Sequence, residues 1–241
     1  MNKITFHANR LYNKVSDKYH PSLAKALVPK WYSSADKYEK NFSNGEYYLN
    51  NEGGKMLSFK ACPALLDIFT SGYIYTTPCD LTFYKNGQGI TVVKTEQGFE
   101  DFCDSRQPMP NFFVPEGYSE NHFHWYPNWA PEVPDGYSAI YLSPINRFDL
   151  PFITTAGIID NDKMNTPGLI PFFLRKDFEG VIPSGTPYLQ IIPFKREDWK
   201  MDLKFYSYTE ILERHNNQAN LYRTKDGGEY KKHTWFKKKY E

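Results

Sequence analysis

The 241-residue sequence has no apolar stretch long enough to cross a membrane, no strong net charge and no internal repeat. Pro, Gly or charged residues break each apolar segment well short of the roughly 20 residues that a spanning helix needs. A net charge of +1 gives no general attraction to nucleic acid or to an anionic membrane. The lack of repeats argues against solenoids and propellers. We therefore expect a soluble protein with no membrane partner and no strong nucleic-acid signal.

Several enzyme signatures are also missing. There is no Walker loop, no Rossmann glycine-rich turn, no Gly-x-Ser-x-Gly elbow and no Cys–His nucleophile pattern. The first residues carry charge but no apolar core of a signal peptide, so we expect a cytoplasmic protein. Cys62, Cys79 and Cys103 match neither a zinc pattern nor a redox pair, and we expect them to be reduced and structural.

Aromatic residues, proline and glycine are abundant. The chain has 19 Tyr, 18 Phe, 17 Pro and 15 Gly, a composition that favours many short strands with bulky side-chain packing over helices. Hydrophobic content of 40% and charged content of 24% are those of a soluble globular protein. The composition therefore predicts a mainly β protein with one core.

The pattern along the chain predicts three parts. Residues 1–56 are interpreted as an N-terminal extension, residues 57–200 as a β-rich core domain, and residues 201–241 as a C-terminal helix followed by a basic tail. The tail carries five lysines from Lys231 onward, which we interpret as a solvated end.

Local signals place a few elements within these parts. Residues 63–69 predict one or two helical turns, because Pro63 fits the first helical position. Asn86-Gly87 predicts a hairpin between two strands. Ser207 and Glu210 have the spacing of a capping box and predict a helix over about 208–217.

The later part of the core domain contains five short strand-like segments separated by Gly and Pro. No helix-length segment lies between them, which favours a closed or clip-like sheet over parallel βαβ architecture. The segments are 137–142, 152–160, 169–174, 180–182 and 188–194.

Three motifs occur in a fixed order within this region. They are Val133-Pro134-Asp135-Gly136-Tyr137, Thr155-Ala156-Gly157-Ile158-Ile159-Asp160 and Ile182-Pro183-Ser184-Gly185-Thr186-Pro187-Tyr188-Leu189-Gln190. In this order the chain resembles the dUTPase and dCTP deaminase superfamily. The resemblance implies a dUTPase-like β-clip or distorted β-barrel with short peripheral helices, assembled as a trimer with sites between subunits.

The resemblance also implies roles for individual residues. Asp160 would be the catalytic carboxylate that takes a proton from water. Arg147, Gly185 and Gln190 would bind the nucleotide, with the Arg147 guanidinium on phosphate. The family enzymes use magnesium, so Mg²⁺ is the cofactor if the chain is catalytic, and the cofactor is otherwise unknown.

The sequence departs from the family pattern at positions where the family enzymes bind the base and the phosphates. Asn161-Asp162-Lys163 follows Asp160 in place of an aromatic residue that stacks on the base, and Asn146-Arg147-Phe148 lacks the hydroxyls that hold phosphate. Asp160 also fits a turn former, and Arg147 also fits a surface ion pair. We therefore favour a non-catalytic binding or assembly protein. The alternative is a deoxynucleoside triphosphate pyrophosphatase or deaminase that uses Asp160 as general base.

His122 and His124 are the one metal-like pair. Two histidines at i and i+2 on a strand point the same way, but a metal site needs further ligands that the sequence does not supply. We predict no metal site here and keep His122 and His124 as weak candidates beside the alternative of polar or aromatic packing.

The expected partners follow from the same observations. We expect a homo-oligomer, with a trimer favoured, and a nucleotide or protein partner. Richness in Lys, Asn and Tyr is compatible with an AT-rich genome such as that of a bacteriophage, which would place the protein in the host cytoplasm or the virion.

Overall fold

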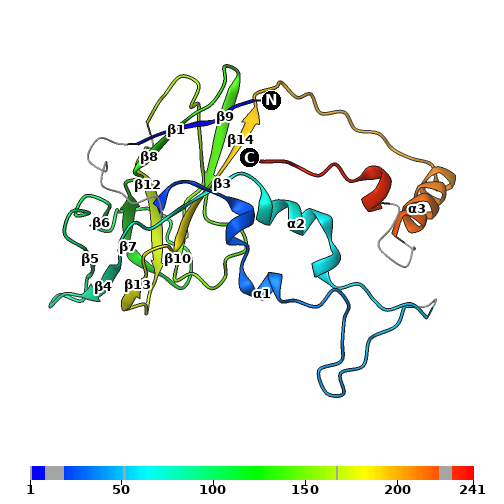
Figure 1. The fold of residues 1–241 in the computed structure, drawn as a ribbon, viewed down its shortest axis with the longest axis horizontal. Helices are drawn as coiled ribbons and strands as arrows, with labels where there is room; N and C mark the ends of the chain where they lie inside the picture. The colour runs from blue at the N-terminus through cyan, green and yellow to red at the C-terminus, as the bar shows by residue number, and fades with distance from the viewer. Residues whose placement is uncertain (1, 9–18, 51–52, 167, 223–229) are drawn as a thin grey trace. The chain divides into compact units, whose positions relative to one another are not determined.

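The computed structural model describes residues 2–8, 19–50, 53–166, 168–222 and 230–241, and it is mainly β, as the composition predicts. Figure 1 shows the strands gathered in one region of the ribbon. The strands are β1 Thr5–Ala8, β2 Ser22–Leu23, β3 Tyr73–Thr76, β4 Leu81–Lys85, β5 Thr91–Thr95, β6 Cys103–Arg106, β7 Tyr118–Trp125, β8 Trp129–Glu132, β9 Tyr137–Leu142, β10 Phe152–Thr154, β11 Gly157–Ile159, β12 Ile170–Arg175, β13 Gly180–Ile182 and β14 Pro187–Lys195. The helices are α1 Lys30–Ser33, α2 Pro63–Thr70 and α3 Tyr208–Tyr222, with short 3₁₀ turns at Ala24–Leu27 and Phe59–Ala61 and a π-helical turn at Tyr230–Thr234.

The strands form four antiparallel sheets. Their strand orders are β1-β8, β10-β12-β7-β6, β11-β9-β14-β3-β2 and β13-β4-β5. None of these orders returns to its first strand, so the described residues form open sheets and not the closed barrel that was one of the two predicted forms. No helix among the described residues has the length and apolarity needed to span a membrane.

The chain divides into two compact units whose limits differ from the predicted parts. The β unit comprises residues 1–27 and 72–196, and the helical unit comprises residues 28–71 and 197–241. Residues 1–27 belong to the β unit because β1 pairs with β8 and β2 pairs with β3. Such long-range pairing leaves no local signal in the sequence, which is why these residues were predicted to be an extension.

Aromatic stacking forms the core of the β unit. The Trp125 ring lies on the Phe172 ring with centroids 3.7 Å apart and planes 8° from parallel, and both side chains are fully buried. The Trp125 Nε1 donates a hydrogen bond of 3.0 Å to the Thr154 hydroxyl, which satisfies its polar atom. Burial of each ring stabilises the fold by about 1.5–3 kcal/mol.

The Asn86-Gly87 hairpin forms between β4 and β5, as predicted, but its turn is wider than a two-residue loop. The Asn86 side chain accepts hydrogen bonds from the backbone N–H groups of Gln88 and Ile90. Gly89 has φ of 77° and therefore adopts the left-handed conformation that closes the turn.

The helical unit has a small aromatic core of its own. Tyr32 is 1% exposed and packs against Phe69 of α2, with ring centroids 4.4 Å apart. The C-terminal tail, predicted to be solvated, contacts α2, because the Trp235 Nε1 and the Lys238 ammonium both donate to the Asp67 carboxylate. Pro63 opens α2, and Ser207 and Glu210 form the predicted capping box ahead of α3.

The three cysteines are free thiols. Cys79 and Cys103 are buried, whereas Cys62 is exposed at the start of α2. Burial of Cys79 and Cys103 fits the predicted structural role of the cysteines, whereas the exposure of Cys62 does not.

Candidate functional site

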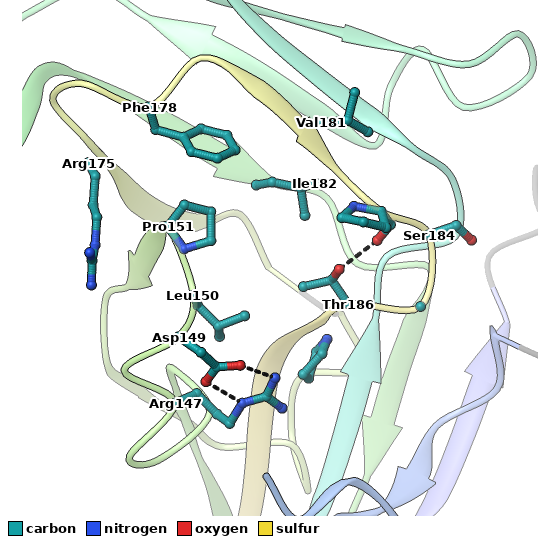
Figure 2. Close-up of a pocket in the computed structure, with 13 residues that line it drawn as sticks. Arg147, Asp149, Leu150, Pro151, Arg175, Phe178, Val181, Ile182, Ser184 and Thr186 are labelled. Atoms are coloured by element: carbon teal, nitrogen blue, oxygen red, sulfur yellow. Dashed lines mark hydrogen bonds and ion pairs between the residues drawn. The ribbon is translucent and has the colours of Figure 1, made fainter. Parts of the chain in front are cut away.

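A cavity of about 640 Å³ lies in the β unit and brings together two of the predicted site residues, Arg147 and Gly185. Figure 2 shows the Arg147–Asp149 pair at one end of this cavity and Phe178 at the other. Asp160 and Gln190 do not line this cavity.

Gly185 occupies a tight turn between β13 and β14. Its φ of 84° is in the left-handed region, and no atom lies within 4 Å of the position that a Cβ would take. Glycine is therefore favoured here by backbone conformation and not by a close neighbour. The turn is fixed by hydrogen bonds from Gly185 N to Thr77 O (2.8 Å) and from Thr186 N to Pro183 O (3.1 Å).

Arg147 is already paired within the protein. Its Nε and Nη2 donate to the two carboxylate oxygens of Asp149 at 2.8 and 2.7 Å, and its side chain is only 15% exposed. The Arg147 guanidinium holds the pKa of Asp149 below its ordinary value. A phosphate entering the cavity would compete with this carboxylate for the same fork of donors.

A second arginine of the cavity was missed by sequence reasoning. Arg175, the last residue of β12, lines the cavity and donates from Nη2 to the backbone oxygen of Phe148 at 3.1 Å. A single Arg at a strand end carries no motif, so only the pairing of β12 with β10 and β7 reveals its position.

Gln190 does not contact the cavity itself but accepts a hydrogen bond from the backbone of the loop that carries Arg147. The residue is 2% exposed within β14, and its Oε1 accepts a hydrogen bond of 3.0 Å from Ile145 N. Because a buried amide must be hydrogen-bonded, this contact fixes the turn after β9 that leads to Arg147. Gln190 therefore positions the cavity wall without lining the cavity.

Asp160 lies at the end of β11 in a different cluster of polar residues. Its Oδ1 accepts from the Ser138 hydroxyl at 2.5 Å and lies 3.2 Å from Nη1 of Arg196, and its side chain is 60% exposed. The carboxylate thus takes part in an ion pair at the end of the antiparallel β9–β11 strand pair.

The buried carboxylate of this cluster is Asp162, which the sequence analysis did not single out. Its side chain has no exposed surface, it forms a two-point ion pair with Arg196, and it accepts a hydrogen bond of 3.0 Å from Gly136 N. The hydrogen bonds from Arg196 lower the pKa of Asp162 to about 2. Asp162 therefore links the turn before β9 to the end of β14 as an ionised group.

His122 and His124 lie on one face of β7, as predicted, with ring centroids 5.3 Å apart. Across the β6–β7 pair they lie opposite Arg106 and Asp104. Burial, together with the Arg106 charge, lowers the pKa values of both imidazoles. No group of three or more His, Cys, Asp or Glu side chains in the described part of the chain has the arrangement of a metal site.

The predicted residues thus lie in three separate places. The cavity holds Arg147 and Gly185, the Asp160–Arg196 cluster lies at the end of the β9–β11 strand pair, and the histidine pair lies on β7. Within a single chain this arrangement supplies a cavity with cationic groups, but it does not bring the proposed general base to that cavity. Comparisons with protein-family models, with characterised proteins and with solved structures find no match for this chain.

Proposed function

We propose that this chain is a non-catalytic binding or assembly protein, in which the β unit is the scaffold and the helical unit supplies contacts to a protein partner. We also propose that the scaffold is a dUTPase-like β-clip. The order of the three motifs and the run of short antiparallel strands from β9 to β14 support this proposal.

The observation that carries the proposal is the apolar surface of the helical unit. Although this unit is the shorter one, it contains seven of the nine large apolar side chains that are at least two-thirds exposed among the described residues. Those of the helical unit are Phe42, Trp199, Met201, Leu203, Phe205, Tyr208 and Phe236, and those of the β unit are Phe113 and Phe148. Five of these seven lie between Trp199 and Tyr208, and exposed apolar side chains gathered in one place mark a surface that a partner covers.

Helix α3 points to the same conclusion. Every described side chain of α3, from Tyr208 to Gln218, is exposed, including Ile211 and Leu212. A 15-residue helix whose described side chains are all exposed is only marginally stable in water by itself. We infer that α3 gains its stability in an assembly, with a homo-oligomer as the favoured form.

The enzymatic alternative has less support. A pyrophosphatase or deaminase needs its general base within hydrogen-bond reach of the bound substrate. Asp160 does not line the cavity that contains Arg147, and its Oδ1 is occupied by Ser138 and Arg196. If the cavity binds a nucleotide, Arg147 and Arg175 are the groups that would meet its phosphates.

The two parts of the proposal, the lack of catalysis and the assembly into an oligomer, are tested by separate experiments. Incubation with the common deoxynucleoside triphosphates and Mg²⁺ is expected to give no turnover. Hydrolysis or deamination that Asp160→Asn abolishes would contradict the non-catalytic assignment. Light scattering on the eluting protein is expected to give a multiple of the 28.3 kDa chain mass.

A further inference from the structure

Residues 199–205 alternate between large apolar and charged side chains. In an extended strand, Trp199, Met201, Leu203 and Phe205 would take one side, and Lys200, Asp202 and Lys204 would take the other. Strict alternation over seven residues is the pattern of a β-strand with one face covered. This segment therefore has the sequence of a strand.

The segment has no strand partner among the described residues. Residues 196–207 belong to no helix or strand, and they pair with none of the strands in the described part of the chain. The four apolar side chains are 68–94% exposed. A strand sequence that has an exposed apolar face and no strand partner in the described part of the chain is suited to adding onto an existing sheet edge.

The β unit offers such an edge at β11. This strand pairs with β9 on one side and is the outermost strand of its five-stranded sheet. Its Ile158 is 64% exposed and is in register with Ile140 of β9, which is in register with Ile192 of β14. A row of isoleucines therefore crosses three strands on the sheet face opposite Tyr141 and Ile191, and it ends at β11, the edge strand among the described residues.

We propose that residues 199–205 of one copy add as an edge strand to β11 of a second copy, with the apolar side chains extending the Ile158–Ile140–Ile192 row. This inference deepens the proposed assembly function and rests on it. The four apolar side chains would gain cover beside the isoleucine row, and the backbone of the segment would gain the hydrogen bonds of a sheet.

A second copy is the occupant that fits both surfaces. Every copy carries one strand-patterned segment and one open β11 edge, so two copies satisfy each other reciprocally. Aromatic side chains bury roughly 150–250 Å² each, and a reciprocal exchange covers Trp199 and Phe205 twice. With Met201, Leu203 and the paired backbone included, the exchange reaches the order of 1,000 Å² that a specific interface needs.

Sedimentation velocity on the full chain tests the role of the segment. In M201K/L203K the apolar face carries two charges, and we expect self-association to weaken at least about tenfold. The matched control, K200S/K204S, changes two charged side chains of the same segment and is expected to associate like the wild type. Both pairs of substituted residues are exposed in the single chain, so circular dichroism is expected to show unchanged folding.

Each outcome of this experiment is decisive. Association that M201K/L203K leaves unchanged would overturn the strand addition while leaving the assembly function in place. If both double variants lose self-association equally, the apolar side chains are not the contact surface, and the proposed strand addition is overturned. A wild-type chain that stays monomeric at every concentration would contradict both the inference and self-assembly.

Disulfide trapping tests the acceptor edge. Cys62 is exposed and is replaced by Ser, whereas Cys79 and Cys103 are buried and remain. One copy then carries Ile158→Cys and the other carries Met201→Cys or Leu203→Cys, because facing residues of paired strands come close enough for a disulfide. We expect a covalent dimer from the mixture with at least one of these two partners.

Asp202→Cys is the control for the trapping experiment, because its side chain lies on the opposite side of the segment. We expect little dimer when this variant is mixed with Ile158→Cys. Equal trapping by Asp202→Cys, or no trapping by either apolar position, would show that β11 is not the acceptor.

Discussion

The two units of the chain use the same abundance of aromatic residues in opposite ways. In the β unit Trp125 and Phe172 stack with no exposed surface, whereas in the helical unit Phe42, Trp199 and Phe205 are 88–107% exposed. The β unit thus obtains its stability from its own core. The described residues of the helical unit form a small buried cluster around Tyr32, and the exposed apolar side chains of this unit are those that we propose a partner covers.

The largest expected effect comes from truncating matched aromatic residues in the two units. Phe172→Ala removes a buried ring and should lower the free energy of unfolding by about 3–5 kcal/mol. Phe205→Ala removes an exposed ring and should change the stability of the single chain by less than about 0.5 kcal/mol. Urea denaturation at a dilution that keeps the chain monomeric measures both, and similar losses would remove the contrast between the units.

Gln190 tests whether a buried polar residue stabilises the β unit from within. Gln190→Ala leaves the Ile145 N–H without its acceptor, and we expect a loss of about 1–3 kcal/mol in the free energy of unfolding. Gln107→Ala, at an exposed position of the same unit, is the control and should be close to neutral. The idea that Gln190 fixes the cavity wall fails if the two variants unfold at the same urea concentration.

Acid tests the Asp162–Arg196 pair. Because this ion pair lowers the pKa of Asp162 to about 2 from 3.8, its stabilising effect is complete above about pH 4 and is lost as the pH falls toward 2. Melting temperatures measured between pH 5 and pH 2 should fall for the wild type, and Asp162→Asn should melt lower at pH 5 and show a shallower decline. Parallel curves for the two proteins would rule out Asp162 as a source of the pH dependence.

The smallest effect is expected at Asp149. Its side chain is 50% exposed, so Asp149→Asn should cost less than about 1 kcal/mol although it breaks a two-point ion pair with Arg147. Urea denaturation again gives the value. A loss as large as that of Phe172→Ala would mean that the cavity wall, and not the aromatic core, sets the stability of the β unit.

Local signals in the sequence predicted local elements well. Pro63 marked the start of α2, and Ser207 with Glu210 marked the start of α3, because caps and first-turn preferences act within a few residues. The pairing of β1 with β8 joins residues about 125 apart in the sequence, and no local pattern encodes it.

The candidate site was predicted only in part, for the same reason. The resemblance assigned Arg147 and Gly185 to nucleotide binding, and both residues line one cavity in the structure, while the binding role itself stays a prediction. It singled out Asp160, whereas the carboxylate with no exposed surface is Asp162, two residues later. Which of two nearby aspartates is buried depends on where Arg196 lies at the end of β14, and this follows from tertiary structure alone.

Hydroxyl-radical footprinting of the assembled protein tests the central claim most directly, because it reports the solvent exposure of individual aromatic side chains. Phe113 of the β unit is 81% exposed and serves as the internal reference for Trp199 and Phe205, which are 88% and 94% exposed in the single chain. We expect Trp199 and Phe205 to be protected in the assembly while Phe113 reacts freely. Oxidation of all three at equal rates would contradict it.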